Sequence, residues 1–247
     1  MLTPSERERY DRQIMIGEIG QEGQEKLKRS RVVIGGAGGL GSLIAVYLTA
    51  AGIGMIRMID HDQVALSNLN RQILHWEEDL GRKKVDSART KLRNLNSGVE
   101  IEAIAETITE GNVSQLVDGC DVIVDAMDNL PTRYVLNRCA IEKKIPFFHG
   151  AVNGFEGRVM TIIPGETACL RCMYRGPIPQ EKFPVVGVAP AVIGVIQATE
   201  VIKYLLEIGK LLTNRLLIYD GLKISFNEFK VERNPDCDHC GRHVRKD

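Results

Sequence analysis

The sequence predicts an α/β fold with a mostly parallel sheet followed by antiparallel C-terminal strands. Two observations carry this prediction. Short apolar runs alternate with helical stretches through the first 145 residues, an order typical of parallel strands joined by crossover helices. After residue 146, two strand-like runs follow each other with only a glycine-containing turn between them, as in an antiparallel hairpin.

Apolar spacing defines the elements expected in the first half of the chain. A β-branched strand at Arg31–Gly35 leads into a helix over 40–51. Gly52 ends that helix, because glycine readily adopts the left-handed conformation found at helix C-termini. Three further strands and one polar helix of exposed composition are expected: strands Met55–Ile59, 99–105 and 121–126, and helix 82–96.

The second half begins with a helix over 131–144, whose first turn suits Pro131. Glycines and prolines make 173–188 a long irregular loop, and loops of this length are often functional. The other expected elements are a hairpin, a helix and two final strands: 146–153 with 158–164, then 190–208, then 216–219 and 224–231.

Composition and charge exclude several classes of protein. The chain has 247 residues, 44% hydrophobic and 26% charged, so it can form one large core and is not disordered. Its 32 Lys and Arg residues balance 32 Asp and Glu residues, which disfavours nucleic-acid binding. The longest uncharged segment, 183–199, is shorter than the roughly 20 residues of a membrane helix, so no membrane partner is expected. The charged N-terminal residues lack the apolar core of a secretory signal, which predicts a cytoplasmic protein.

A glycine-rich turn follows the first expected strand. Residues 36–41 match the G-x-G-x-x-G pattern between a strand and a helix, and Asp60 ends the next strand about 20 residues on. Glycines let backbone N–H groups approach a phosphate, the helix N-terminus favours its charge, and the carboxylate can bind ribose hydroxyls. The sequence therefore predicts a Rossmann-like mononucleotide site that leaves NAD, FAD and ATP open, with four candidate glycines: Gly36, Gly38, Gly39 and Gly41.

The residues after Asp60 favour a triphosphate over a dinucleotide. Amide and cationic donors that suit a triphosphate follow this strand, and the nucleotide-binding candidates are Asp62, Asn68, Arg71, Gln72 and Lys84. Charge alone favours a different interpretation of residues 82–84, namely the solvated start of a helix.

Asp128 and Asn129 follow an expected strand at the edge where ligands of parallel sheets bind. An acidic residue at this place could hold magnesium against phosphates. A helix cap before Pro131 explains the same pair equally well on local grounds.

Four of the six cysteines form two C-x-x-C pairs, Cys169 with Cys172 and Cys237 with Cys240. Together they complete a tetrahedral four-cysteine shell without an open position, which predicts a structural zinc site. Two redox dithiols are the alternative, and a single zinc ion explains both pairs better. His239, inside the second pair, could replace a cysteine as ligand, but a solvated side chain is expected. The two other cysteines are expected to be buried thiols: Cys120 and Cys139.

These motifs together resemble the MoeB/ThiF/HesA family of ubiquitin-activating-like adenylyltransferases. The resemblance spans nearly the whole chain and rests on motifs in order: Arg9-Tyr-Asp-Arg12-Gln13, the glycine turn, Asp60, Ser67-Asn-Leu-Asn-Arg71-Gln72, Lys84, Asp128-Asn129 and the paired cysteines. It implies an enzyme that binds ATP and Mg²⁺, adenylates the C-terminal glycine carboxylate of a small ubiquitin-like sulfur-carrier protein ending in Gly-Gly, and releases pyrophosphate. The carrier then becomes a thiocarboxylate for thiamine- or molybdopterin-type sulfur transfer. A homodimer with Zn²⁺ in the four-cysteine site is also implied.

The resemblance further implies roles at matching positions. Asp60 would bind ribose, and Asn68, Arg71 and Lys84 would hold the phosphates. Arg12 is similar to the family's arginine that reaches the triphosphate of the other subunit, and Asp128 would position magnesium and the reacting phosphate. The expected catalytic residues are therefore Arg12, Arg71, Lys84 and Asp128. One adenylating domain would comprise a helical arm, a nucleotide-binding half, and a carrier-binding and zinc half, at about 1–28, 29–145 and 146–247.

One departure separates this chain from ThiF-like members. Those carry a cysteine that can link to the carrier in the loop after the first C-x-x-C, whereas residues 173–236 contain no cysteine. We therefore expect an enzyme that stops at the adenylate. The alternatives are an NAD-dependent oxidoreductase, a non-catalytic adaptor, and an enzyme that adenylates a carboxylate of a small molecule or tRNA.

Overall fold

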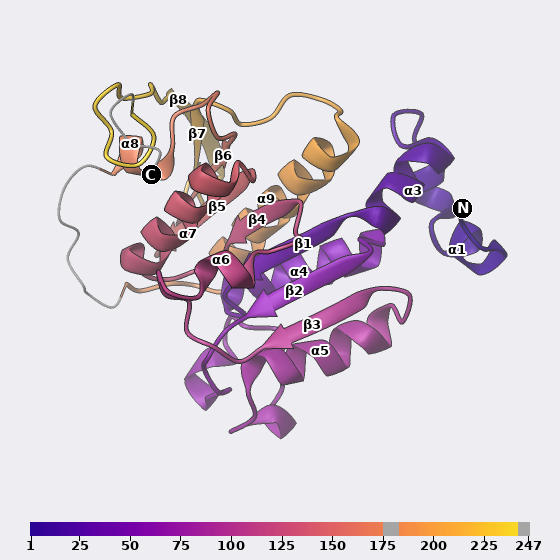
Figure 1. The fold of residues 1–247 in the computed structure, drawn as a ribbon. Coiled ribbons are helices and arrows are strands. Elements are labelled where there is room, and N and C mark those ends of the chain that lie inside the picture. Colours follow the sequence, from indigo (N-terminus) through magenta and orange to yellow (C-terminus); the bar gives the residue numbers. More distant parts are fainter. Residues whose placement is uncertain (175–182, 242–247) are drawn as a thin grey trace.

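An eight-stranded sheet runs through the computed structural model, which describes residues 1–174 and 183–241. The strand order is β3-β2-β1-β4-β5-β6-β7-β8 (Figure 1). Strands β3 to β5 are parallel neighbours and β6 to β8 are antiparallel, as the sequence predicts. The strands are β1 Arg31–Gly35, β2 Met55–Ile59, β3 Glu100–Ile104, β4 Val122–Asp125, β5 Phe147–Asn153, β6 Glu156–Ile162, β7 Arg215–Asp220 and β8 Ser225–Lys230.

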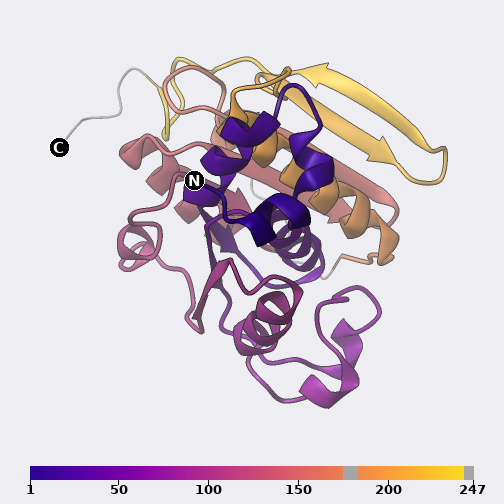
Figure 2. The same cartoon turned by 90° about the vertical axis from the view of Figure 1, so that its right-hand side faces the viewer.

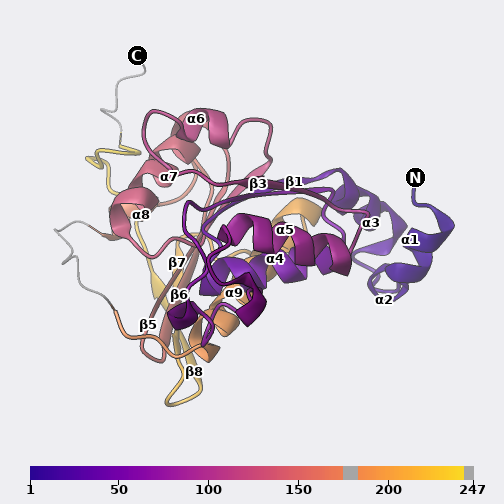
Figure 3. The ribbon, with the colours of Figure 1, turned by 90° about the horizontal axis from the view of Figure 1, so that it is seen from below.

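Helices cover both faces of the parallel part of the sheet, because strands in such a sheet are buried on both sides. Helices α4, α5 and α9 lie on one face, and α6 and α7 lie on the other (Figure 3). Val32 and Ile34 belong to the buried cluster of the first face, and Val33 belongs to that of the second, since successive strand side chains point to opposite faces. The helices are α1 Pro4–Arg9, α2 Asp11–Ile14, α3 Gly20–Arg29, α4 Gly39–Ala51, α5 Lys84–Leu95, α6 Val113–Leu116, α7 Leu130–Lys143, α8 Leu170–Met173 and α9 Val188–Leu206.

The two ends of the molecule carry different features. The three N-terminal helices form an arm at one end, which faces the viewer in Figure 2. Helix α8 and the loop with the second cysteine pair lie at the opposite end (Figure 1). Between these ends, the carboxyl ends of β1, β2 and β4 meet at one edge of the sheet and bring their loops together.

The expected strands and longer helices are confirmed, with bounds that differ by at most two residues. Helix α5, expected from its composition to be exposed, buries one side through Val85, Ala88 and Leu92. Helices α6 and α8 are single turns, too short to leave a periodic pattern, and were not expected. Of the expected loop 173–188, residues 175–182 lie outside the described residues.

Helix α9 is long and apolar enough to cross a membrane by length and composition. It packs against α3, α4, β5 and β6, and it buries Gln197 and Glu200. Both polar side chains have hydrogen-bond partners inside the protein, so α9 has the contacts of a core helix.

Candidate nucleotide and metal sites

The four glycines of the turn do different work. Gly36 has a φ of +103°, and a Cβ there would lie 2.6 Å from the Ala126 carbonyl oxygen. A Cβ at Gly41 would lie 2.0 Å from the Gly36 oxygen, so both glycines are required by packing. A Cβ at Gly38 would approach only the Gln72 amide nitrogen, at 3.6 Å. Packing therefore does not require a glycine at position 38, which is half-buried at the N-terminus of α4, where a phosphate would be favoured.

Asp60 fixes the backbone of this turn. Its carboxylate accepts hydrogen bonds from the Ala37 and Asp62 backbone N–H groups, both at 2.8 Å. His75 binds the carbonyl group of Ala37, since its Nε2 lies 2.9 Å from that oxygen. A carboxylate can accept about four hydrogen bonds, so Asp60 keeps acceptor capacity for ribose hydroxyls.

Lys84 is buried, with 5% of its surface exposed. Its Nζ donates to the Asp62 carboxylate at 2.8 Å. Partial burial opposes ionisation of Asp62, but this hydrogen bond and the Lys84 charge outweigh it and lower the Asp62 pKa. The interpretation of residues 82–84 as a solvated helix start is therefore wrong for Lys84. A buried cation needs a charged or polar partner, and a count of charges along the chain does not reveal that Asp62 is this partner.

The stretch 68–72 lies against the glycine turn. A Cβ at Gly39 would lie 3.4 Å from the Arg71 carbonyl oxygen, and the Gln72 amide faces Gly38. Asn68 accepts a hydrogen bond from the Ala65 backbone, and Arg71 donates through Nη1 to the Ser67 carbonyl and to Asn70. Gln72 is buried, and its Oε1 has no partner among the described residues. The structure thus brings this stretch together with the glycines.

Asp128 and Asn129 lie on the loop that follows β4, next to the glycine turn. Gly36 is in contact with Ala126 and Met127 of this loop. The Asn129 side chain accepts from the Thr132 backbone at 3.0 Å and caps α7, so the helix-cap interpretation is confirmed for Asn129. Asp128 is exposed, and its carboxylate accepts a 3.4 Å hydrogen bond from the Asn129 amide.

Arg12 lies away from these residues. It is exposed on α2, and its neighbours Tyr10 and Gln13 contact Gly52 and the Ala51 carbonyl at the C-terminal end of α4. The glycine turn lies at the other end of that helix, which is 13 residues long, or about 20 Å. The structure does not bring Arg12 to the glycine turn of its own chain.

Several buried polar residues near this edge escape sequence reasoning. His149 is fully buried and donates from Nδ1 to Asp125 at 2.7 Å, while Arg133 lies 3.6 Å from the same carboxylate. Burial lowers the pKa of His149, and it likewise lowers that of His75. The only sequence signal is an acidic residue, Asp125, inside an otherwise apolar strand.

The four paired cysteines meet at the far end of the molecule, and all four are buried. Their sulfurs are 3.7 Å apart for Cys169 and Cys237, and 3.5 Å apart for Cys172 and Cys240. A tetrahedral ion with bonds of about 2.3 Å requires sulfurs about 3.8 Å apart, so this set fits one metal ion. Hydrogen bonds from the neighbouring thiols, Cys169 first, lower the pKa of Cys240 to about 5 and favour a thiolate there.

His239 is buried, with 5% of its surface exposed, so the expectation of a solvated side chain is wrong. Its Nδ1 accepts from the Asn137 amide at 2.8 Å, and the Asn137 carbonyl accepts from the Leu170 backbone at 3.0 Å. One α7 side chain thus binds both cysteine loops, which the local pattern Cys-Asp-His-Cys could not reveal. Cys120 and Cys139 are buried, as expected.

Comparisons with known proteins agree with these features. The ThiF family matches residues 10–239. SAMP-activating enzyme E1 of Haloferax volcanii is 42% identical over 97% of this chain and 91% of that protein. Sulfur carrier protein adenylyltransferase of Thermus thermophilus is 42% identical over 97% of this chain and 92% of that protein. A crystal structure of E. coli MccB with ATP has a TM-score of 0.84 at 25% identity, over 94% of this chain and 74% of that one. The chain therefore belongs to the ThiF family.

Proposed function

We propose that this chain is an ATP-dependent adenylyltransferase that activates the C-terminal glycine carboxylate of a small ubiquitin-like sulfur carrier. The product is an acyl-adenylate, and pyrophosphate is released. The observation that carries the proposal is the backbone of Gly38 at the α4 N-terminus, which lies against the Gln72 amide, with buried Lys84 on the neighbouring helix. A relative that is 42% identical bears the name sulfur carrier protein adenylyltransferase.

The reaction needs positioning and charge neutralisation more than acid–base chemistry. The carrier carboxylate attacks the α-phosphorus in line, its oxygen forms the new bond, and pyrophosphate leaves with the electron pair of the broken bond. In our proposal the turn amides and Asn68 orient the phosphates, and Arg71 and Lys84 neutralise the leaving group. Asp60 holds the ribose, and Gln72 and Asn129 line the pocket with Asp62, which keeps Lys84 in place.

Two metal ions belong to the proposal. Magnesium, when bound, would neutralise charge on the phosphates, and the exposed Asp128 carboxylate is the group we assign to hold it. Zinc in the four-cysteine cluster would be structural, since four thiolates leave no open position. Two C-x-x-C pairs gathered at one possible metal site also suit a reducing compartment, in keeping with a cytoplasmic location.

Arg12 would act in a homodimer. Arg12 lies about one helix length from the glycine turn of its own chain. This distance supports a role at the triphosphate bound by a second copy of the chain. We also propose that catalysis stops at the adenylate, because residues 173–236 contain no cysteine for a covalent link. Mass spectrometry that detects a covalent adduct of this chain with a carrier would contradict that part.

The test is ATP–pyrophosphate exchange by the purified protein with a panel of small ubiquitin-like proteins ending in Gly-Gly. Each carrier is paired with a control that lacks the last glycine. Exchange that appears with one carrier and disappears with its truncated form supports the proposal. Exchange with none, while ATP still binds, would point instead to a carboxylate of a small molecule or tRNA. Binding of NAD in place of ATP would indicate an oxidoreductase.

A further inference from the structure

A buried polar cluster lies directly beneath the loop that carries Asp128. It consists of Asp125, at the end of β4, His149 in β5 and Arg133 in α7, and we call it the Asp125 cluster. The Asp125 carboxylate accepts from His149 Nδ1 at 2.7 Å and from the Met127 backbone N–H at 3.1 Å. Asp125 and His149 are fully buried, and the Arg133 side chain is 11% exposed.

Arg133 connects the loop after β4 with the middle of β5. Its guanidinium donates through Nε and Nη2 to the Met127 carbonyl, and through Nη2 to the Gly150 carbonyl at 3.0 Å. Met127 immediately precedes Asp128, and Gly150 belongs to β5. A planar guanidinium can hold several acceptors in fixed directions, which an ammonium on a flexible stem cannot do.

Helix α9, on the opposite face of the sheet, also binds the backbone at the end of β4. Gln197 of α9 donates from Nε2 to the carbonyls of Asp125, at 2.9 Å, and Phe148, at 3.0 Å. A Cβ at Gly150 would lie 2.1 Å from Gln197 Oε1, so this contact is close. The segment 125–127 is therefore fixed from both helical layers.

The Asp128 side chain depends on that support. Within residues 1–174 and 183–241, its hydrogen bond is the 3.4 Å contact from its neighbour Asn129. Side-chain contacts thus fix the Asp128 carboxylate only weakly, and the backbone around Met127 determines where it points.

We propose that Arg133 is a positioning residue for adenylation, which sets the direction of Asp128 through the Met127 carbonyl. The inference rests on the proposed function of this site. The competing interpretation is that Arg133 only balances the buried Asp125 charge. Loss of Arg133 would then lower stability and leave turnover of the folded enzyme unchanged.

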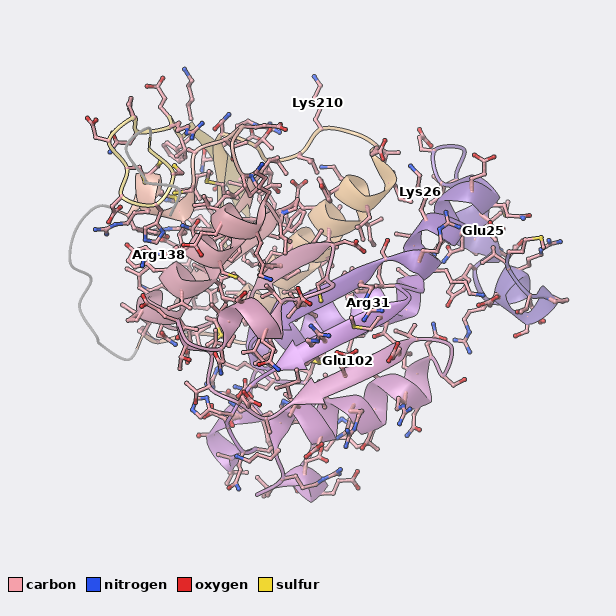
Figure 4. The ribbon with its side chains drawn as sticks, in the orientation of Figure 1. Glu25, Lys26, Arg31, Glu102, Arg138 and Lys210 are labelled. Atoms are coloured by element: carbon pink, nitrogen blue, oxygen red, sulfur yellow. The ribbon has the colours of Figure 1, made fainter. Side chains whose placement is uncertain are left out.

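The experiment compares Arg133→Gln and Arg133→Lys with two controls, by ATP–pyrophosphate exchange well below each melting temperature. Arg138→Gln removes an exposed arginine of the same helix, which pairs with Glu110 (Figure 4). Glu200→Gln disturbs a buried carboxylate that binds Thr161 and the Leu212 backbone, away from Asp128. Glu200→Gln therefore reports what lost stability alone does to turnover.

We expect kcat to fall about 10- to 100-fold in Arg133→Gln, with the KM for ATP changed less than about threefold, as for a misplaced catalytic group. Arg133→Lys keeps the positive charge but loses the planar guanidinium that binds both carbonyls, so its kcat should also fall, by a smaller factor. Both controls should keep the wild-type kcat. A wild-type kcat in both folded Arg133 variants, or in Arg133→Lys if only that variant folds, would overturn the inference.

A double-mutant cycle identifies the route. If Arg133 acts through Asp128, adding Arg133→Gln or Arg133→Lys to Asp128→Asn should change the residual single-turnover rate little. Multiplied losses would show that Arg133 acts elsewhere and would overturn the inference. Silence of the wild type with every carrier would instead refute the proposed function, so the two failures are distinct.

Discussion

The glycine-turn site and the four-cysteine cluster differ in how their polar groups are partnered. In the first, Asp60 binds backbone amides, Lys84 pairs with Asp62, and the turn keeps its shape through protein contacts alone. In the second, four buried thiols lie close together, with sulfur contacts of 3.5 to 4.0 Å. The comparison teaches that the nucleotide site is organised before a ligand arrives, whereas the cysteine cluster would be completed by the metal ion that we propose for it.

Metal removal should give the largest effect on stability. A chelator, or Cys237→Ser, should lower the free energy of unfolding by several kcal/mol, because binding energy at a structural site is folding energy. Urea unfolding with and without chelator, with metal content measured in parallel, checks this. Cys139→Ala is the matched control, since Cys139 is buried outside the cluster and should cost about 1 kcal/mol or less. Equal unfolding curves with and without chelator would contradict the comparison.

Loss of a catalytic group at the nucleotide site should reduce activity and leave stability nearly unchanged, the reverse of metal removal. We expect Asp128→Ala or Arg71→Ala to reduce adenylation at least about 100-fold with the melting temperature nearly unchanged, because both side chains contribute few internal contacts. Pyrophosphate exchange and thermal unfolding measure the two quantities. Arg89→Ala, which removes a half-buried residue paired with Asp86, is the control. Normal turnover in either variant would remove that residue from the catalytic set.

A smaller effect should follow from loosening the glycine turn. His75 is buried, and its Nε2 can donate to the Ala37 carbonyl while Nδ1 accepts from Ser87. His75→Ala should raise the KM for ATP about fivefold, the equivalent of roughly 1 kcal/mol for one hydrogen bond. His75→Gln places an amide donor near Nε2 and should restore most of the affinity. A KM unchanged in His75→Ala would show that the turn holds its shape without this contact.

The smallest expected effect is on the pH dependence of stability. Burial lowers the pKa of His149, so below about pH 6.5 the unfolded chain binds a proton that the folded chain does not. The free energy of unfolding should therefore fall slightly as the pH falls from 7 to 5, since protonation favours the unfolded chain in this range. His149→Asn keeps a donor to Asp125 and cannot titrate, so its urea midpoint should vary less with pH. Identical pH profiles would exclude His149 as a contributor.

The parts of the molecule that sequence predicts are those set by local rules. Strand and helix periods, the glycine turn and the C-x-x-C spacings each follow from neighbouring residues, and the sheet and the cysteine cluster appear as expected. One longer-range relation also follows from the parallel order, because neighbouring strands bring the loops of Gly36 and Asp128 to one edge.

The parts that sequence misses are set by distant partners. Lys84 reads as a surface charge until Asp62, 22 residues away, is seen beside it. His239 reads as solvated until Asn137 is placed against it, 102 residues earlier in the chain. The Asp125 cluster combines three segments, and no period or spacing links them.

The spacing of the two cysteine pairs has a consequence for synthesis of the protein in the cell. Cys169 and Cys237 are 68 positions apart, with α9, β7 and β8 between them. At about 5 to 20 residues per second, a ribosome needs about 3 to 14 s to make that stretch. During this interval the first cysteine pair leaves the ribosome before the second pair has been synthesised. If the cluster holds a metal ion, as we propose, the first two thiols must stay reduced until the second pair has been made and the ion binds.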